Sequence, residues 1–380
     1  MRILYIQDSL GTGGAERSNA ELWYYLRAKD IELRIVALEH RKEGIEQEII
    51  EAGFDVVFLR QASFINQANQ IKNAIKNFKP DIVHSVLFRA NMRVRLVKLF
   101  YKFRHVESLV NCTYDEIRYQ DANINSMLLK VYEKLDGLSQ NIGVDHFLAI
   151  TNEVKNHYIK HLNIKPKKLT VISRGRKENQ FRSEKKYLRM ALNKELDLDY
   201  EGLIFIHVGR QEFQKAHLDI LKAIKIIDKE LAIAKAQFLF CGRKGNATGE
   251  IDDFLKQNVL STRVEFLGHR NDVYQLMVAS DVFLFPSRFE GLGGSLIEAQ
   301  AAGLPVICSD IPVFKEVVSP LNAKFHKTND PKSLSLVLKE MIFQNNLEEM
   351  GKISLKNYNE NFQLGNINRK MLEFYYNILL

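Results

Sequence analysis

The 380-residue chain has few cysteines and no long apolar runs. Cys112, Cys241 and Cys308 are widely spaced and stand in apolar surroundings, which excludes a disulfide framework and a cysteine-based zinc site. They favour a reducing, cytoplasmic environment. No stretch reaches the ~20 apolar residues that a transmembrane helix needs. The short apolar run at the start is typical of a first strand rather than a signal peptide.

Basic residues are in excess, with a net charge of +8, and the excess is uneven. Residues 1–180 carry 28 Lys and Arg against 21 Asp and Glu, whereas the remainder carries 26 against 25. This asymmetry predicts an anionic partner for the first half, either a polyanion or a membrane surface. A basic face that only contacts solvent is the alternative.

Short apolar runs alternate with segments of helical period along the whole chain. Near-continuous apolar runs such as 203–208 and 282–285 are typical of parallel strands covered on both faces. About twelve such strands are too many for one sheet of this kind, so we predict an α/β fold with two parallel-sheet domains. The bounds that we expect are a first domain at 1–175, a charged linker at 176–202, a second domain at 203–355 and a terminal helix at 356–380.

A glycine-rich loop follows the first expected strand and contains Gly11, Gly13 and Gly14. Glycines allow a tight turn and a close approach to a ligand, and a helix start after them suits a phosphate. Glu16 replaces the third glycine of a dinucleotide fingerprint, and no Walker lysine follows. Simple turn chemistry is therefore an open alternative.

A cationic pair follows the strand expected at 203–209. Arg210 leaves the end of that strand, and Lys215 stands where the next helix opens. Ligands of open α/β sheets bind outside the carboxyl ends of strands, so the pair could hold a diphosphate. Two solvated surface cations are the alternative.

The most specific block runs from Phe285 to Pro305. Glu290 begins a glycine-rich loop, and Glu298 stands eight residues later in a helix that opens at Gly293 and Gly294. The exposed N–H groups at such a helix start form an anion cradle. The two carboxylates could accept hydrogen bonds from hydroxyl pairs on either side of it, which is the layout of a sugar nucleotide. A glutamate that only complements the helix dipole is the alternative.

Together these blocks resemble the retaining GT-B glycosyltransferases, specifically glycosyltransferase family 4. The resemblance covers nearly the whole chain in order. The block at 285–305 is highly specific and the others are individually weak. They read Gly-Gly-Ala-Glu-Arg at 13–17, Asp-Ile-Val-His at 81–84, His-Phe-Leu-Ala-Ile at 146–150, Lys-Leu-Thr-Val-Ile at 168–172, Gly-Arg at 209–210 with Lys215, and Phe-Leu-Gly at 266–268.

The resemblance implies a role for each matching residue. Arg210 and Lys215 would hold the donor diphosphate and stabilise the departing charge in place of a metal ion. Glu290 would bind the transferred sugar, and Glu298 would accept from the ribose hydroxyls. The remaining donor contacts would come from Gly13 and Gly14 on the diphosphate, Gly268 near the base, and Gly291, Leu292, Gly293, Gly294 and Ser295 around sugar and phosphate.

The same resemblance implies a complete enzyme: a retaining, metal-independent transferase with a central cleft between two Rossmann-like domains. The first domain would hold the acceptor, the second the nucleotide sugar (a UDP-sugar by preference), and the terminal helix would cross back to the first domain. The acceptor would be a glycan or a lipid-linked glycan of cell-surface polysaccharide biosynthesis, and no cofactor is expected. A sugar-nucleotide epimerase or hydrolase, and a non-catalytic glycan- or membrane-binding relative, are the alternatives.

Two positions depart from the family pattern. Val86 replaces a histidine that in relatives lies by the sugar, and His84 two residues earlier is either a substitute or, by preference, a structural histidine. Arg174-Gly-Arg-Lys177 replaces the usual Asn-Gly-Ile/Val-Asp and adds cations that suit an anionic acceptor. Both changes affect the expected acceptor chemistry more than donor binding.

The segment at 88–104 has six cations, no acid and many apolar residues. As a helix it could lie on an anionic membrane surface through these cations, which are Arg89, Arg93, Arg95, Lys98, Lys102 and Arg104. A core-packed helix with a basic outer face is the alternative. We expect no nucleic-acid partner, because no recognition fold signature is present.

Metal sites are not expected. Asp197-Leu-Asp199 matches the Asp-x-Asp motif of a different glycosyltransferase fold, but it stands in the interdomain stretch and is best interpreted as surface acids. The expectation for the ten histidines is likewise that none forms a zinc site.

Overall fold

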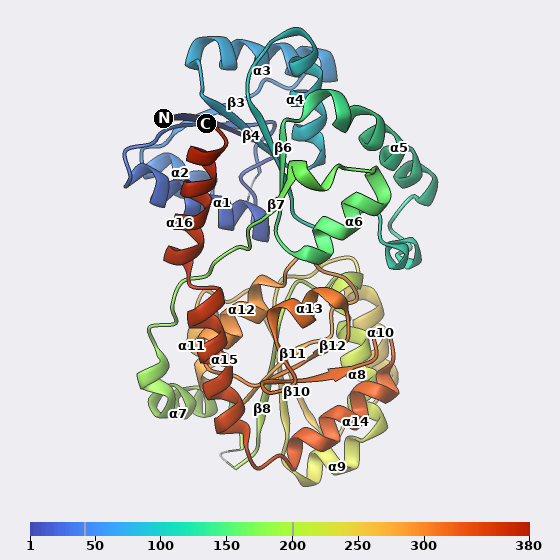
Figure 1. The fold of residues 1–380 in the computed structure, drawn as a ribbon. Coiled ribbons are helices and arrows are strands. Elements are labelled where there is room, and N and C mark those ends of the chain that lie inside the picture. The colour runs from blue at the N-terminus through green and yellow to red at the C-terminus, as the bar shows by residue number, and fades with distance from the viewer. Residues whose placement is uncertain (42, 200) are drawn as a thin grey trace. The chain divides into compact units, whose positions relative to one another are not determined.

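The computed structural model describes residues 1–41, 43–199 and 201–380. They form two compact units, coloured from blue to red along the chain in Figure 1. Unit 1 comprises residues 1–119, 124–175 and 364–380, and unit 2 comprises residues 120–123 and 176–363. Each unit contains one parallel sheet, so the predicted two-domain α/β class is confirmed.

The sheet of unit 1 has seven strands in the order β3-β2-β1-β4-β5-β6-β7. All of its pairings are parallel. The strands are β1 (Arg2–Gln7), β2 (Glu32–Ala37), β3 (Asp55–Phe58), β4 (Ile82–Val86), β5 (His105–Leu109), β6 (His146–Ala149) and β7 (Leu169–Val171).

Helices cover both faces of this sheet. They are α1 (Gly14–Arg27), α2 (Glu46–Glu51), α3 (Phe64–Phe78), α4 (Phe88–Phe100), α5 (Ser126–Gly143), α6 (Asn152–Leu162) and α16 (Leu364–Asn377). Alternation along β1 explains the two cores, because successive strand side chains point to opposite faces. Ile3 and Tyr5 pack with residues of α1 and α16, whereas Leu4 and Ile6 pack with residues of α3 and α4.

The sheet of unit 2 has six strands in the order β10-β9-β8-β11-β12-β13, again all parallel. They are β8 (Ile204–Val208), β9 (Gln237–Cys241), β10 (Arg263–Gly268), β11 (Val282–Phe285), β12 (Val306–Ser309) and β13 (Ala323–His326). The edge strand β13 was missed from the sequence, because its four residues Ala-Lys-Phe-His carry no continuous apolar run.

The helices of unit 2 are α7 (Lys185–Leu196), α8 (His217–Ile226), α9 (Asp228–Ile233), α10 (Thr248–Gln257), α11 (Val273–Ala279), α12 (Gly294–Ala301), α13 (Pro312–Val317), α14 (Pro331–Ile342) and α15 (Leu347–Asn361). The part of the chain that the structure describes also has four short 3-10 helices: η1 (Glu116–Gln120), η2 (Pro166–Lys168), η3 (Arg182–Glu184) and η4 (Phe213–Lys215). Phe205 of β8 packs with Ile220 and Ile224 of α8 and with Leu334 and Leu338 of α14 in the core.

The segment expected to be a linker is folded. Residues 176–202 contain η3 and α7, and Leu192 of α7 is buried. Arg189 joins α7 to the rest of unit 2, since its Nη1 lies 2.6 Å from the Asp281 carboxylate and 3.0 Å from the Ala279 carbonyl oxygen. The prediction of a linker was wrong because α7 is rich in charged residues, which obscure its short apolar side. Helix α15 ends at Asn361, and the chain continues into α16, which belongs to unit 1.

Candidate active site

The centre of the sheet in unit 2 is a topological switch point. The chain runs from β8 outward through β9 to β10 and returns to the other side of β8 as β11. Neighbouring strands whose connections diverge leave a crevice at their carboxyl ends, where α/β proteins bind ligands. The loops after β8 and β11 carry the two blocks singled out from the sequence, and they lie side by side for this reason.

The loop after β8 bends Lys215 back over the strand end. Gly209 leaves room for this bend, because a Cβ there would lie 3.2 Å from the Lys215 side chain. The Lys215 ammonium forms an ion pair with Glu290 and lies 5.0 Å from the centre of the Phe285 ring. Arg210 instead pairs with Glu212 at 2.8 Å and is 56% exposed. Lys215 is thus fixed at the strand ends, while Arg210 faces solvent.

The loop after β11 brings the second carboxylate into place. Glu290 is largely buried and is held by Lys215, although the two residues are 75 positions apart in the chain. This contact joins the two blocks. A buried carboxylate is stable when paired with a cation in this way.

A neighbouring ion pair clamps the two loops together. Arg288 donates to both carboxylate oxygens of Asp219, at 2.9 and 3.0 Å, and to the Phe213 carbonyl oxygen at 3.0 Å. Its guanidinium also lies 4.1 Å from the Phe213 ring centre, and both partners of the ion pair are buried. The sequence did not predict a role for Arg288 or Asp219, because no local pattern distinguishes them from other charged residues.

The glycines before α12 have distinct roles. Gly293 adopts φ +86°, a left-handed conformation that favours glycine. At Gly294 a Cβ would collide with the guanidinium of Arg176, which lies directly over the helix start. Arg176 also donates through Nε to Glu298 at 3.0 Å. The anion cradle predicted from the sequence therefore has a cation beside it, from the segment that departs from the family pattern.

The other expected donor residues lie along the same edge of the sheet. Ser295 donates through Oγ to the Val208 carbonyl oxygen at 3.4 Å, linking α12 to β8. Leu292 is buried in the loop. Gly268 ends β10 at φ +63°, and no other described heavy atom lies within 4 Å of a Cβ built there. Gly291 precedes Leu292 in the loop between β11 and α12.

Two neutral histidines lie behind the Lys215 loop. The rings of His207 on β8 and His217 on α8 have centres 4.4 Å apart, and both residues are buried. Burial, assisted by the nearby charge of Lys215, lowers the pKa of His207 to about 4. Burial also lowers the pKa of His217 to about 2, with smaller contributions from His207 and Lys215. Both rings are therefore neutral supports of the loop near pH 7.

Unit 1 has its own switch point, between β1 and β4. Gly13 precedes α1 after β1, and a Cβ there would collide with the Glu16 carboxylate, which folds back over it. A Cβ at Gly14 would meet no other described heavy atom within 4 Å. Asp8 accepts from the Ala90 N–H at 2.7 Å and so joins the loop after β1 to the start of α4. Burial raises the pKa of this carboxyl to about 6.

Comparison with known families agrees with this architecture. The family described as Glycosyltransferase Family 4 matches residues 12–179, and that described as Glycosyl transferases group 1 matches residues 190–357. The chain belongs to glycosyltransferase family 4. It is therefore a glycosyltransferase, and the predicted family and GT-B fold are confirmed.

Among the relatives is a UDP-Gal:alpha-D-GlcNAc-diphosphoundecaprenol alpha-1,3-galactosyltransferase of Escherichia coli, 27% identical, with 82% of this chain and 80% of the relative covered. Another is an N,N'-diacetylbacillosaminyl-diphospho-undecaprenol alpha-1,3-N-acetylgalactosaminyltransferase of Campylobacter jejuni, 24% identical, with 89% and 85% covered. Among solved structures, Anabaena Alr3699/HepE in complex with UDP superposes with a TM-score of 0.84 at 16% identity, covering 99% of this chain and all of that one.

In this family 4 enzyme, His84 and Arg174 belong to a buried polar chain of unit 1. His84 is fully buried; its Nδ1 lies 2.5 Å from the Tyr375 hydroxyl and its Nε2 lies 2.7 Å from the Ser108 hydroxyl. Arg174 donates to the same Ser108 oxygen at 3.3 Å, and Tyr375 also contacts the Tyr5 hydroxyl. The geometry of His84 is that of the structural histidine preferred from the sequence.

The structure of the basic segment at 88–104 differs from the prediction that all six of its cations face outward. Arg93 and Arg95 are buried within unit 1 rather than exposed, and Arg95 pairs with Glu107 and with Asp136 at 2.5 and 2.6 Å. Lys98 pairs with Asp145 at 2.5 Å and Arg89 with Glu39 at 2.8 Å. The inward-facing acids come from other elements, so the local pattern could not reveal them. Lys102 and Arg104 are exposed, as expected.

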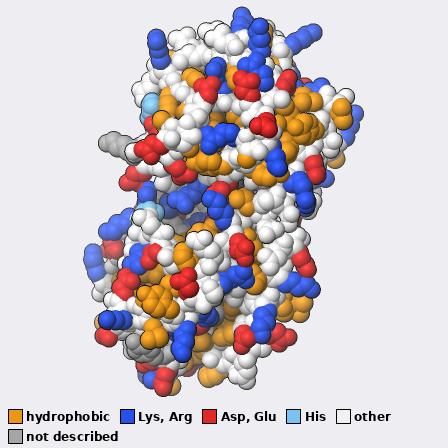
Figure 2. Space-filling view, turned by 90° about the vertical axis from the view of Figure 1, so that its left-hand side faces the viewer, with side chains coloured by type: hydrophobic (Ala, Val, Ile, Leu, Met, Phe, Trp, Pro, Cys, Tyr) orange, Lys and Arg blue, Asp and Glu red, His pale blue; other side chains and the backbone are white. Residues whose placement is uncertain are grey.

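Charge on the face drawn in Figure 2 does not single out one region, because basic and acidic side chains are interspersed there.

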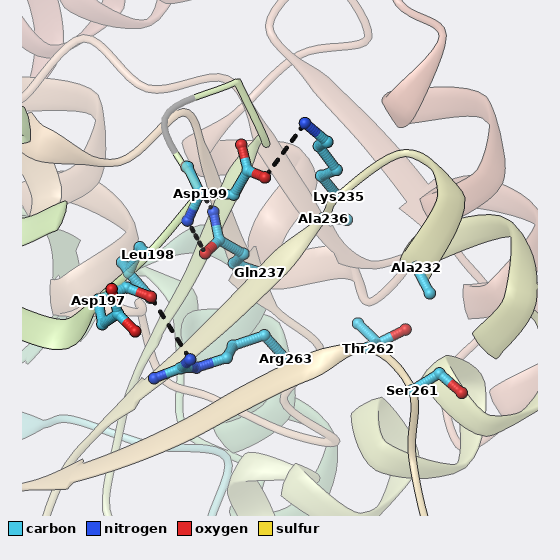
Figure 3. A pocket seen from close by; sticks show the side chains of 10 residues that line it. All are labelled: Asp197, Leu198, Asp199, Ala232, Lys235, Ala236, Gln237, Ser261, Thr262 and Arg263. Atoms are coloured by element: carbon cyan, nitrogen blue, oxygen red, sulfur yellow. Dashed lines mark hydrogen bonds and ion pairs between the residues drawn. The ribbon is translucent and has the colours of Figure 1, made fainter.

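A pocket of about 380 Å³ lies at the amino ends of β9 and β10, on the opposite edge of the sheet from the Lys215–Glu290 pair. Asp197 and Asp199 line it, as Figure 3 shows, and Asp199 pairs with Lys235 at 3.2 Å. These acids are thus separated from the loops after β8 and β11.

The expectation that none of the ten histidines forms a zinc site overlooked the spacing of one pair. His157 and His161 stand one turn apart on α6, which is a spacing used in zinc sites. Here Nε2 of His157 accepts from the Tyr114 N–H at 3.0 Å, and Nδ1 of His161 lies 2.6 Å from Glu133. Across 1–41, 43–199 and 201–380, no group of three or more His, Cys, Asp or Glu side chains is arranged to hold a metal ion.

Proposed function

We propose that this enzyme transfers a sugar, with retention of anomeric configuration and without a metal ion, from a UDP-sugar to a lipid-linked glycan acceptor in cell-surface polysaccharide biosynthesis. One observation carries the donor half of the proposal. Lys215 and Glu290 meet across the β8–β11 switch point, and Glu298 stands on the helix that opens from the same loop. A cation, an anion cradle and two carboxylates along one edge match the parts of a nucleotide diphosphate sugar.

The residues have distinct roles in this proposal. Lys215 and the exposed Arg210 stabilise the negative charge that develops on the leaving diphosphate, as preorganised cations do without a metal. The N–H groups at the start of α12 add the positive end of the helix dipole. Glu290 accepts from hydroxyls of the transferred sugar, and Glu298 accepts from the ribose. Lys215 and Arg176, which now pair with these carboxylates, then turn to the phosphates.

Several relatives support the choice of donor and acceptor. The Escherichia coli relative is named for UDP-galactose and for a diphosphoundecaprenol-linked acceptor, and the Campylobacter jejuni relative for a diphospho-undecaprenol-linked acceptor. A capsular polysaccharide biosynthesis glycosyltransferase of Staphylococcus aureus is 23% identical with 90% of this chain covered. Anabaena Alr3699/HepE binds UDP-glucose. The basic excess of residues 1–180 suits a diphosphate-linked acceptor.

A panel of nucleotide sugars read by thermal shift tests the donor, because a tight ligand raises the melting temperature by mass action. We expect UDP-sugars to give the largest shift. Transfer of the selected sugar to a short-chain diphosphate-linked acceptor, followed by NMR of the anomeric proton, tests retention; activity in a chelator tests metal independence. An inverted product, or loss of activity that added metal restores, would remove the corresponding part of the proposal.

A further inference from the structure

Helix α5 of unit 1 has its apolar side facing outward. Met127, Val131, Leu135, Leu138 and Ile142 recur at intervals of three and four residues, which places them on one side of the helix. We call these five residues the α5 ridge. All of them are exposed, Met127 at 79% and Leu138 at 73%. A surface helix of a globular protein has the opposite arrangement, with apolar residues toward the core.

Buried polar contacts fix this orientation. Asp136 lies on the inner side of α5 and accepts from Arg95 at 2.6 Å and from the Tyr114 hydroxyl at 2.6 Å. Gln140, one turn later, donates to the Leu162 carbonyl oxygen at 3.1 Å. A rotation of α5 that buried the ridge would take Asp136 away from Arg95 and from the Tyr114 hydroxyl, and buried groups that lose a hydrogen-bond partner are costly. The outward apolar side is therefore built into the unit.

The ridge continues onto neighbouring helices. A hollow of about 180 Å³, apolar apart from Arg95 and Ser139, is lined by Ile142 of the ridge, Phe64 of α3 and Leu99 of α4, among others. Phe100 at the end of α4 is 73% exposed. Figure 1 shows α5 at the outer side of unit 1, away from α1 and α16. Contiguous apolar surface of this kind marks a docking site rather than scattered surface residues.

The charges beside the ridge favour an anionic partner. The exposed positions of α5 include Lys130 and Lys134 and no acid, and Lys102 and Arg104 follow Phe100. The acids of α5 are occupied: Asp136 is buried, and Glu133 lies 2.6 Å from His161. In a symmetric dimer through this patch the lysines of both copies would face one another. An anionic lipid surface receives both the apolar side chains and the lysines favourably.

We propose that the α5 ridge is the surface by which unit 1 lies on an anionic lipid bilayer, with the hollow beside Ile142 receiving acyl chains. A search of the described residues finds no helix with the length and hydropathy of a membrane span. The inference deepens the proposed function, since a lipid-linked acceptor has to be reached at the membrane. It differs from the basic-helix prediction, because insertion of apolar side chains carries the binding and the lysines add to it.

Flotation with two vesicle types tests the proposal: phosphatidylcholine mixed with phosphatidylglycerol, and phosphatidylcholine alone. The wild-type protein is expected to bind the mixed vesicles. The double variant Met127→Ser/Leu138→Ser should bind them about 10²-fold more weakly, because two exposed apolar side chains no longer insert. Lys130→Gln/Lys134→Gln should lose about fivefold per lysine and most of its salt dependence. The matched control is Ile233→Ser/Val259→Ser, whose positions on unit 2 are equally exposed and should change nothing.

A second measurement does not depend on removing the ridge. A polarity-sensitive dye on Leu138→Cys should shift to the blue with mixed vesicles, and the same dye on Val259→Cys should not; Cys112, Cys241 and Cys308 are buried and should not compete for labelling. Wild-type binding by the ridge variant, no binding by the wild type, or a dimer that the ridge variant dissociates without vesicle binding would each overturn the proposal. Transfer to a short-chain acceptor in solution should be unchanged in the ridge variant, and failure of that transfer in every variant would refute the proposed function instead.

Discussion

The two units place polar groups around equivalent switch points in different ways. In unit 2 the site comes from two short blocks, residues 209–219 and 285–298, which meet through the Lys215–Glu290 and Arg288–Asp219 pairs. In unit 1 the polar chain of Tyr5, His84, Ser108, Arg174 and Tyr375 draws on five separate segments, and the contacting residues Tyr5 and Tyr375 are 370 positions apart. Unit 2 gathers ion pairs at the carboxyl edge of its sheet, whereas the chain in unit 1 fastens α16 into the core through buried hydroxyl and imidazole contacts, with Arg174 at one end.

The largest effect is expected where unit 2 buries charge. Asp219→Asn should lower the free energy of unfolding by about 3–5 kcal/mol, because Arg288 is left as an uncompensated buried cation. Urea denaturation measures the loss. Glu340→Gln removes an exposed ion pair with Lys324 and should cost less than about 1 kcal/mol. Equal losses in the two variants would show that the clamp is an ordinary surface contact.

The next effect is on turnover. Lys215→Ala, Glu290→Ala and Arg210→Ala should each lower kcat by at least about 10²-fold while the fold stays intact, since in the proposed function each removes a group that contacts the reacting diphosphate or sugar. Steady-state kinetics with the selected donor measures this. Lys235→Ala, at the opposite edge of the sheet, is the control and should keep its rate. Wild-type rates in the three variants would remove the roles assigned to the switch point.

The pH dependence of stability tests the histidines behind the Lys215 loop. The folded pKa values of His207 and His217, about 4 and about 2, lie below the unfolded value of 6.5, so the unfolded state binds more protons in this range. Their contribution is complete well above pH 6.5 and is lost as pH falls through and below this value, by about 3 kcal/mol for the pair near pH 5.5. Denaturation of wild type and His207→Phe/His217→Phe at several pH values measures it. An identical pH slope in both would contradict the neutral-support role.

The smallest effect is expected at a hydroxyl of the buried polar chain of unit 1. Tyr375→Phe removes one hydroxyl shared by Tyr5 and His84 and should cost about 1–2 kcal/mol. Thermal unfolding measures it, and Tyr376→Phe, whose side chain is exposed, is the neighbouring control. A loss as large as that of Asp219→Asn would mean that the two units do not differ in the way described.

The fold and the donor block were predictable because their signals are local. Parallel strands show as apolar runs, and the carboxyl ends of neighbouring strands gather at one edge, so Lys215 and Glu290 could be assigned to one place. The block from Phe285 to Pro305 also carries its glycines and carboxylates within a few turns of chain. Local spacing is enough for such features.

The features that the sequence did not reveal depend on contacts between distant segments. Arg95 was counted as a surface cation because Glu107 and Asp136, its partners, stand on other elements. The Arg288–Asp219 clamp joins residues 69 positions apart, and α7 was taken for a linker because its charge hides a short apolar side. The orientation of α5 is likewise set by Arg95 from another helix. Periodicity identifies a helix. It does not show which side of the helix faces the core when an ion pair with another element decides the orientation.

Calorimetric titration of the intact protein with the best UDP-sugar tests the central claim most directly, namely that the carboxyl edge of the sheet in unit 2 holds the donor. Glu298→Gln should weaken binding about tenfold, since a charged acceptor for the ribose hydroxyls is lost. Glu265→Gln, a half-buried position paired with Arg263, should bind as the wild type does. Equal affinity of Glu298→Gln and wild type would contradict the claim.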